Sequence, residues 1–293
     1  MKLYADKTPD SQYQERLQFI LKNGELIKET PQGVGAITVF GGLSPMVFDL
    51  DNGLPVITCR DISKFWVKPI AEILAFIHGA QTLKELEEVG CGWWKDWATP
   101  KKCAAIEVPE GDLGPGSYGP AFHDFPMPNH QTFNQFSHVV RQIKHYPHVR
   151  TAFVSPWIPY LIGRGGWQKA VVSPCHGWVH LRVINGRLDL HMFQRSADFP
   201  VGVPANMIQY AALLLMIAQV TGYRPGRFIH SFSDAHIYEN QVEAVKEMVK
   251  RKPRSLPSIG INSDIEDLFA FEPDHFTLFD YYPHPAMKIP VAI

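Results

Sequence analysis

Side chains whose types and spacing could carry out covalent chemistry are gathered in one short stretch, from Ser173 to Asn206. The stretch opens with a thiol and continues with two strand-like segments joined at Asn185-Gly186, a strong hairpin signal. At the ends of these elements stand the five groups Cys175, Arg195, Ser196, Asp198 and Asn206. They could gather a nucleophile, an anion-binding group and polar hydrogen-bonding groups around one small anionic molecule.

Cys175 is the candidate nucleophile of this stretch. A cysteine attacks as its thiolate, which a nearby positive charge favours, and Arg195 can supply that charge by reaching back across the hairpin. His176 invites comparison with a Cys-His dyad, but neighbours on a strand point to opposite faces, so we expect a structural role. The other thiols have no C-x-x-C spacing and are expected to be inert: Cys59, Cys91 and Cys103.

A second candidate group is the carboxylate of Glu72, within the helix expected from Pro69 to His78. Its neighbours along the helix are apolar, and burial of a charged group among them would be costly. The alternative is that Glu72 lies on an exposed stripe of the helix.

A long buried helix is expected over Pro204–Thr221, and it would carry Asn206. It should end at Gly222, because glycine is a typical helix C-cap.

The remaining elements are predicted from periodicity and turn residues. Expected helices cover 13–27, 82–89, 131–146 and 236–250; expected strands cover 33–48 (paired, with a turn at Gly41-Gly42), 54–58, 151–155 and 228–231. Residues 99–117 and 160–171 are expected to be loops, the second of them glycine-rich around Gly163–Gly166.

Length and composition predict one globular domain over residues 1–293. The chain is 45% hydrophobic, which allows a sizeable core, and its formal charge of −1 gives no electrostatic footprint for nucleic acid or an anionic membrane. Its longest apolar run, Ala211–Ala218, is too short to span a bilayer, and its N-terminus lacks the apolar core of a signal peptide. We expect a cytoplasmic protein with reduced cysteines and no metal site.

Four motifs in this order resemble the thymidylate synthase family. They are Pro174-Cys175-His176, Gln194-Arg195-Ser196-x-Asp198, Gly202-x-Pro204-x-Asn206 and the run Asp234-x-His236-x-Tyr238. The likeness extends from about Gly33 to the closing Pro290–Ile293, and several spaced motifs are far more specific than any one. The resemblance implies an α/β (α+β) fold with a large, mostly antiparallel sheet, flanking helices and dimerisation through the sheet.

The resemblance also implies folate-dependent one-carbon transfer to C5 of a pyrimidine nucleoside monophosphate, with 5,10-methylenetetrahydrofolate as co-substrate. Cys175 would add to C6 of the base, and Asn206 would hydrogen bond O4 and N3, which favours dUMP over dCMP. Proton transfer would involve Glu72 and Tyr118 through ordered water. The nucleotide would contact Arg195, Ser196, Asn206, His236 and Tyr238 of its own subunit and Arg150 of the partner subunit, in an obligate homodimer with shared sites. The folate would contact Trp94, Trp97, Val172, Asp198, Val201, Gly202 and Ala292.

This chain departs from the family at the phosphate and beside the folate ring. An early arginine is replaced within Pro31–Gly33, the usual Arg-Arg pair is Arg150-Thr151, and the usual aromatic residue before Asn206 is Ala205. Arg60 and Lys64 are candidates to compensate at the phosphate.

The leading interpretation is a thymidylate synthase, because Trp94 and the closing tail would exclude water. The alternative is a 5-hydroxymethylase of dUMP, dCMP or CMP, which Ala205 and the altered phosphate cluster favour. A more distant alternative is a non-catalytic nucleotide- or RNA-binding relative. The only nucleic-acid partner left open is the protein's own mRNA.

Overall fold

A large β-sheet forms the framework of the computed structural model, which describes residues 1–163 and 167–292. Within these residues, seven strands join in the order β1-β2-β9-β8-β7-β6, and β3 pairs with β9 beside β2. The strands are β1 (Glu25–Ile27), β2 (Ala36–Phe40), β3 (Met46–Asp49), β6 (Phe153–Val154), β7 (Trp178–Ile184), β8 (Arg187–Asp198) and β9 (Arg224–Tyr238). All pairs are antiparallel except β8 with β9. The expected α/β fold with a mostly antiparallel sheet is confirmed.

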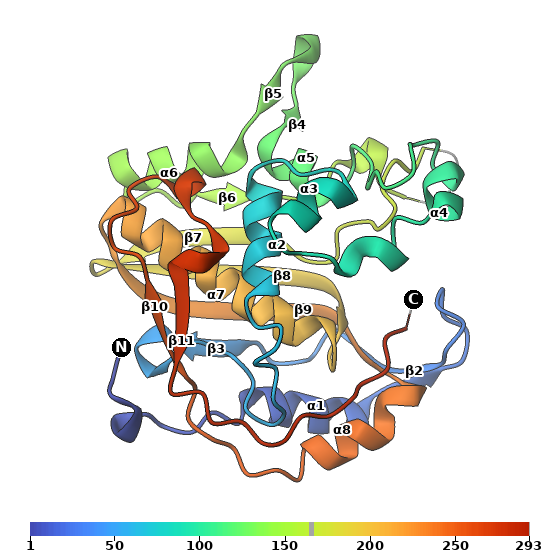
Figure 1. The fold of residues 1–293 in the computed structure, drawn as a ribbon, viewed down its shortest axis with the longest axis vertical. Helices are drawn as coiled ribbons and strands as arrows, with labels where there is room; N and C mark the ends of the chain where they lie inside the picture. Colours follow the sequence, from blue (N-terminus) through green and yellow to red (C-terminus); the bar gives the residue numbers. More distant parts are fainter. Residues whose placement is uncertain (164–166, 293) are drawn as a thin grey trace.

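Helices cover one face of this sheet. They are α1 (Gln12–Asn23), α2 (Lys68–Ile77), α3 (Leu83–Glu88), α4 (Pro100–Ala105), α5 (Tyr118–His123), α6 (Gln135–His145), α7 (Gly202–Thr221) and α8 (Val242–Met248). Helix α7 packs on β8 and β9, and α2 packs against α7, so that Figure 1 shows two layers of helix in front of the strands. The expected helix around Glu72 is confirmed as α2.

Helix α7 is the centre of the core. It connects the parallel strands β8 and β9, as crossover connections between parallel strands usually do. It ends at Gly222, whose φ of 76° is the left-handed conformation that favours glycine, as predicted. By length and apolar composition alone α7 could span a membrane, but 89% of its most apolar 18-residue window is buried inside the protein, as in a core helix.

The hairpin of β7 and β8 is also confirmed. Asn185 and Gly186 both have positive φ angles, 50° and 72°, which a two-residue turn of this twist requires. Ile184 pairs with Arg187 across the turn. Along β8, Leu190, Met192 and Gln194 are buried whereas His191 and Phe193 are exposed, so the strand alternates between the helix-covered face and an open face.

Strand β9 contradicts the helix predicted over 236–250. It continues through His236 to Tyr238, and α8 begins only at Val242. The reason is long-range pairing, since β9 pairs with β2, β3 and β8 along its length. His236 and Tyr238, the last two residues of their motif, therefore lie on a strand. They are at the same end of the sheet as Ser196 and Asp198 of β8.

Other predicted boundaries were wrong. The first helix ends at Asn23 and the chain turns into β1; the strand predicted over 54–58 is an irregular buried segment; the loop predicted over 99–117 contains α4; and α6 begins only after the short strand β5 (Thr132–Phe133). The strands predicted in 33–48 exist as β2 and β3, but both pair with β9 rather than with each other. Within the predicted glycine-rich loop, residues 164–166 lie outside the described residues.

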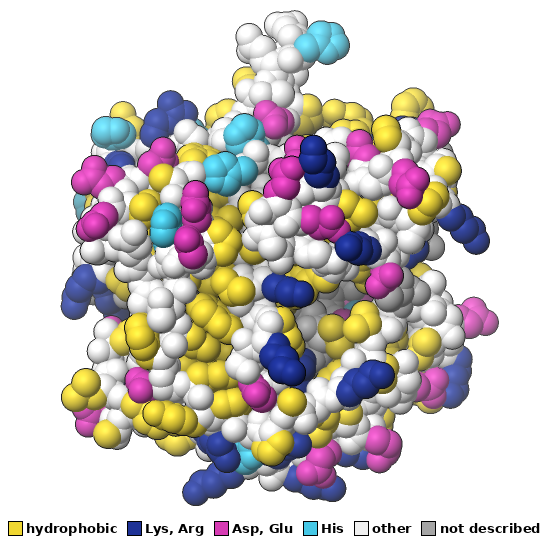
Figure 2. All heavy atoms as spheres, in the orientation of Figure 1, with side chains coloured by type: hydrophobic (Ala, Val, Ile, Leu, Met, Phe, Trp, Pro, Cys, Tyr) yellow, Lys and Arg dark blue, Asp and Glu magenta, His cyan; other side chains and the backbone are white. Residues whose placement is uncertain are grey.

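Two small sheets lie apart from the main one. Strand β5 pairs with β4 (Phe125–Pro126), and this hairpin projects from the body of the molecule in Figure 1. The other small sheet pairs β10 (Ser258–Ile261) with β11 (Phe276–Phe279). Lys and Arg side chains are interspersed with Asp and Glu over the face drawn in Figure 2, in keeping with the formal charge of −1.

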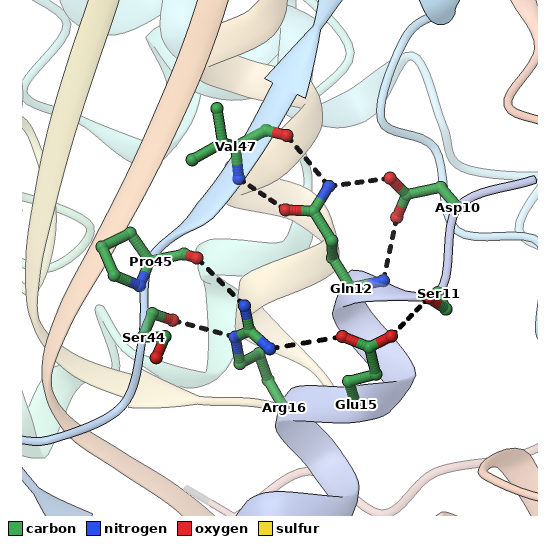
Figure 3. A network of polar contacts seen from close by, with 8 residues as sticks. All are labelled: Asp10, Ser11, Gln12, Glu15, Arg16, Ser44, Pro45 and Val47. Atoms are coloured by element: carbon green, nitrogen blue, oxygen red, sulfur yellow. Dashed lines mark hydrogen bonds and ion pairs between the residues drawn. The ribbon is translucent and has the colours of Figure 1, made fainter. Parts of the chain in front are cut away.

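The start of α1 is tied to β3 by side chains that replace a missing neighbouring strand (Figure 3). The Gln12 amide donates to Val47 O at 2.9 Å and accepts from Val47 N at 2.7 Å. Arg16 donates to Ser44 O at 2.9 Å and to Pro45 O at 3.1 Å. These contacts pair backbone groups of β3 and of the two residues just before it, and they fix α1 beside the sheet.

Candidate active site

A cavity of about 1120 Å³ opens where the ends of β2, β8 and β9 face α4 and the segment before β7. Small-molecule sites typically measure roughly 300–1,000 Å³, so this cavity can take more than one ligand. Seven of the predicted site residues line it: Trp97, Val172, Cys175, Arg195, Ser196, His236 and Tyr238. They come from β8, from β9, from the segment before β7 and from the tryptophan segment near residue 97, which are separated in sequence and meet in the fold.

Cys175 and Arg195 are in contact at the wall of this cavity. Arg195 Nη2 lies 3.5 Å from Cys175 Sγ, and Arg195 N donates to Cys175 O at 2.8 Å. The guanidinium is oriented by Pro174 O and Ser173 O, at 2.8 and 2.9 Å, and it lies 5.5 Å from the ring centre of Trp157. The predicted approach of Arg195 to Cys175 across the hairpin is confirmed.

The thiol of Cys175 experiences opposing influences. Burial raises its pKa above the ordinary value, the Arg195 charge lowers it, and the Asp234 carboxylate raises it again. Since the burial effect is the largest, Arg195 alone does not make the thiol a thiolate in the free protein. Cys59, Cys91 and Cys103 are buried in the core, as predicted, whereas Cys175 is only half-buried.

Tyr118 lies directly behind the nucleophile. Its hydroxyl accepts a hydrogen bond from Cys175 N at 2.7 Å, and its buried ring stacks between Phe76 and His176. Burial raises the Tyr118 pKa well above its ordinary value, so the phenol keeps its proton. The ring of Trp94 packs edge-on against the same tyrosine.

His176 is buried away from the thiol chemistry, as expected. Its Nδ1 lies 2.7 Å from the hydroxyl of Tyr210 on α7, and burial lowers its pKa to about 3. A neutral imidazole held by a core tyrosine supports the backbone that carries Cys175. The geometry therefore agrees with a structural role.

Glu72 is buried, so the alternative of an exposed stripe is wrong. Its Oε1 accepts from the indole nitrogens of Trp93 and Trp94 at 2.6 and 2.5 Å, and its Oε2 accepts from Gln209 Nε2 at 2.5 Å. Burial raises the pKa of Glu72, and these three hydrogen bonds lower it. They compensate for the cost of burying the carboxylate.

Asn206, in the second turn of α7, joins Glu72 through Gln209. Asn206 Nδ2 donates to Gln209 Oε1 at 2.9 Å, and Gln194 Nε2 donates to Asn206 Oδ1 at 3.1 Å. Asn206 and Gln209 are three residues apart and share one helix face. Asn206, Glu72, Tyr118 and Trp94 thus form a buried polar layer behind the cavity wall rather than part of the lining.

Asp198 connects the cavity to the C-terminal tail. It accepts hydrogen bonds from Val201 N and from the Gln241 amide, each at 3.3 Å, and Gln241 also donates to Pro290 O at 2.9 Å. Burial raises the pKa of Asp198 to about 6. Ala292 packs against Ala36 and Tyr238 beside the cavity. Ile293, the last tail residue, lies outside the described residues.

Some predicted residues are not brought to the cavity. Arg150 is exposed, and its carbonyl accepts from His180 Nε2 at 3.1 Å on the open face of the sheet. Val201 and Gly202 lie at the start of α7 behind the lining. Gln32, within the run that replaces the early arginine, does line the cavity.

Neither proposed substitute for the missing arginines lies at the cavity. Arg60 is buried and donates to Pro200 O at 2.9 Å, and Lys64 is exposed away from the lining.

Several polar and aromatic groups at this site are not among the predicted site residues. Asp234, the first residue of its motif, lines the cavity and accepts a hydrogen bond from Thr38 on β2. Trp157 lines it beside Arg195. Gln209 could have been noticed as a polar residue within the apolar α7, whereas nothing in the sequence shows that Trp93 donates to Glu72 alongside Trp94.

A mostly antiparallel sheet with helices on one face, and a cysteine–arginine pair at a cavity on its end, define a thymidylate synthase-like protein. The sequence model of the thymidylate synthase family matches residues 11–293, and the chain belongs to this family. Family membership implies a transferase of nucleotide biosynthesis that moves a one-carbon unit from a folate to a pyrimidine nucleotide.

Proposed function

We propose that this protein is a thymidylate synthase, which converts dUMP and 5,10-methylenetetrahydrofolate to dTMP and dihydrofolate. The observation that carries the proposal is the contact of Cys175 Sγ with Arg195 at a cavity backed by Glu72, Tyr118 and Asn206. A nucleophile, a cation and a buried acid–base layer on adjoining elements meet the needs of this chemistry.

In the proposed reaction, the Cys175 sulfur adds to C6 of uracil and makes C5 nucleophilic toward the one-carbon unit. Negative charge then develops on O4, where Asn206 donates a hydrogen bond and stabilises it. Glu72 removes the C5 proton through ordered water, to which the protonated Tyr118 donates a hydrogen bond. Hydride from the folate then reduces the methylene group, and the Cys175 sulfur leaves C6. Because burial raises the Cys175 pKa, the thiol is protonated before the base binds and must lose its proton as the sulfur adds to C6.

The ligand contacts follow from the lining of the cavity. Arg195 and Ser196 bind the phosphate, and His236 and Tyr238 bind the sugar hydroxyl. Trp97 and Val172 provide apolar surface for the folate. Asp198 does not line the cavity, and we assign the pterin amide to it from the family resemblance alone. The tail, held through Gln241 and Ala292, covers this end of the cavity and keeps water from the intermediate.

A 5-hydroxymethylase is the second candidate, and the short side chain of Ala205 favours it. Ala205 is half-buried at the start of α7 next to Asn206, where family members carry an aromatic residue. The space could hold a water that attacks the exocyclic methylene instead of hydride. Mass analysis of the products from dUMP, dCMP, UMP and CMP with methylenetetrahydrofolate decides between the candidates. A methylated dUMP product supports the proposal, and a hydroxymethylated product overturns it.

Asn206→Asp should move base preference from uracil toward cytosine. A carboxylate has no N–H donor for O4, and a site with unpaired polar groups discriminates strongly, by about 10² or more in relative kcat/KM. Turnover of dUMP and dCMP measured side by side checks this ratio. An unchanged preference would show that another residue recognises the base.

We also propose a homodimer formed through the open face of the sheet. Phe193 and Phe153 are 37% and 50% exposed there, and Trp178 packs edge-on against Phe193. Exposed aromatic side chains on a sheet face are typical of a protein–protein contact. Arg150 lies on this face beside His180, so it is available to a partner's phosphate site rather than to its own.

Mixing Arg150→Ala with Cys175→Ser subunits should restore activity from two poorly active parents. In the hybrid dimer one site carries both defects and the other carries neither, so complete exchange should give about a quarter of wild-type activity. Arg141→Ala, an exposed arginine on α6, is the control and should be fully active alone. If verified hybrids are no more active than their parents, the two subunits do not share sites.

A further inference from the structure

Asn206 is held by a different partner at each end of its side-chain amide. Gln194 Nε2 donates to its Oδ1 at 3.1 Å, and its Nδ2 donates to Gln209 Oε1 at 2.9 Å. Gln209 is fully buried and Gln194 is 2% exposed, so water does not replace these hydrogen bonds. The amide keeps one N–H and one oxygen lone pair that these two contacts do not use.

Groups at both ends set the direction of this chain of hydrogen bonds. Gln209 Nε2 donates to Glu72 Oε2 at 2.5 Å, and an ionised carboxylate can only accept. Gln194 Nε2 also donates to Ser196 O at 3.0 Å, which leaves its Oε1 to accept from His230 Nε2 at 2.8 Å. Gln209 therefore orients Asn206 with reference to the Glu72 carboxylate.

A half-turn of the Asn206 amide would break both of these contacts. Nδ2 would then face the Gln194 donor, and Oδ1 would face the Gln209 acceptor, leaving buried polar groups unpaired. The orientation of the amide matters for base recognition, because uracil and cytosine differ by an exchange of donor and acceptor at the same positions. Uracil offers an O4 acceptor and an N3–H donor, whereas cytosine offers an N4–H donor and an N3 acceptor. A freely rotating asparagine would suit either base, and a fixed one suits only one of them.

We propose that Gln209 is a positioning residue that determines base specificity, because it fixes the Asn206 amide relative to the Glu72 carboxylate. The inference rests on the proposed function, in which Asn206 faces the base of a pyrimidine nucleotide. Gln209 also links base recognition to proton transfer, because it binds both the Asn206 amide and the carboxylate of Glu72, the proposed general base.

The test is Gln209→Met, which keeps the chain length and removes both hydrogen bonds. Relative kcat/KM for dUMP and dCMP should change by at least about tenfold toward equality. The pKa of Glu72, followed without substrate by NMR of ¹³C-labelled glutamate and assigned with Glu72→Gln, should rise. Its contacts with Trp93, Trp94 and Cys91 remain in the variant. A packing defect alone would not move both readouts.

Two further variants sharpen the test. Gln219→Met makes the same change on the same helix and removes bonds to Asn262 O and Ile265 O, both 2.8 Å, so both readouts should stay at wild-type values. Gln194→Met removes the other tie to Asn206 and should lower base discrimination without raising the Glu72 pKa. If Gln209→Met does not fold, Gln209→Leu is measured in its place, with the same two readouts and the same expected changes.

The outcomes separate this inference from the proposed function. Unchanged discrimination in folded Gln209→Met overturns the role of Gln209. If the wild type prefers dCMP, the proposed substrate is wrong, yet loss of that preference in the variant still supports Gln209. If the wild type converts neither nucleotide, the proposed function fails, and an unchanged Glu72 pKa in the variant then overturns the Gln209 contact as well.

Discussion

Cys175→Ser should abolish turnover, lowering kcat by at least about a thousandfold, while dUMP still binds. A serine hydroxyl has nearly the size of the thiol but is a far weaker nucleophile at neutral pH. Arg195 would keep its bonds to Ser173 O and Pro174 O, so the phosphate contact of the site should survive. Steady-state kinetics and calorimetric titration with dUMP separate the two effects.

Cys103→Ser is the matched control, because that thiol is buried in the core and lines no part of the cavity. It should keep wild-type kcat, at some cost in stability. Comparable activity of Cys175→Ser and the wild type would remove the thiol from the chemistry. Loss of dUMP binding in Cys175→Ser would instead indicate that the substitution disturbs the whole site.

Glu72→Gln should lower kcat by about 10²–10⁴ with a much smaller effect on dUMP binding. The side chain keeps its size but can no longer accept a proton from water in the site. Because burial raises the pKa of Glu72, the carboxylate loses its charge at a higher pH than an exposed glutamate would. Wild-type kcat should therefore fall as the pH drops through that raised pKa, and Glu72→Gln should lack this acidic limb.

Glu247→Gln, an exposed glutamate near the end of α8, is the control for this change and should show the wild-type pH profile. A Glu72→Gln variant with near wild-type kcat would place the proton transfer elsewhere. If kcat of that variant still falls at acidic pH, another group causes the fall. Asp198 is a candidate, because burial raises its pKa to about 6.

Local signals predicted the parts of the fold that depend on nearby residues. Asn185-Gly186 specifies a hairpin because its two positions need positive φ, and Gly222 ends α7 for the same reason. Segments decided by distant partners were predicted less well. Residues 54–58 are apolar like a strand, but Leu54 N donates to Pro257 O and the run packs in the core without a ladder. His236 was assigned to a helix because its pairing with Thr38 on β2 is not visible locally.

At the site, the resemblance named residues of which seven line one cavity, but it could not supply their mutual contacts. The approach of Arg195 to Cys175 follows from the hairpin, and the structure confirms it. The burial of Glu72 depends on donors from Trp93, Trp94 and Gln209, which come from two other elements. Sequence spacing carries no information about these hydrogen bonds, because they form only when α2, α7 and the tryptophan segment pack together.

Trapping with 5-fluoro-dUMP and methylenetetrahydrofolate tests most directly the claim that Cys175 attacks C6 and C5 then takes the one-carbon unit. Fluorine cannot leave C5 as a proton does, so the covalent complex of protein, nucleotide and folate should accumulate. Intact-protein mass spectrometry should show one nucleotide and one folate per subunit, and peptide mapping should place the adduct on Cys175. An adduct on Cys59, Cys91 or Cys103, or a bound but unreacted nucleotide, would contradict it.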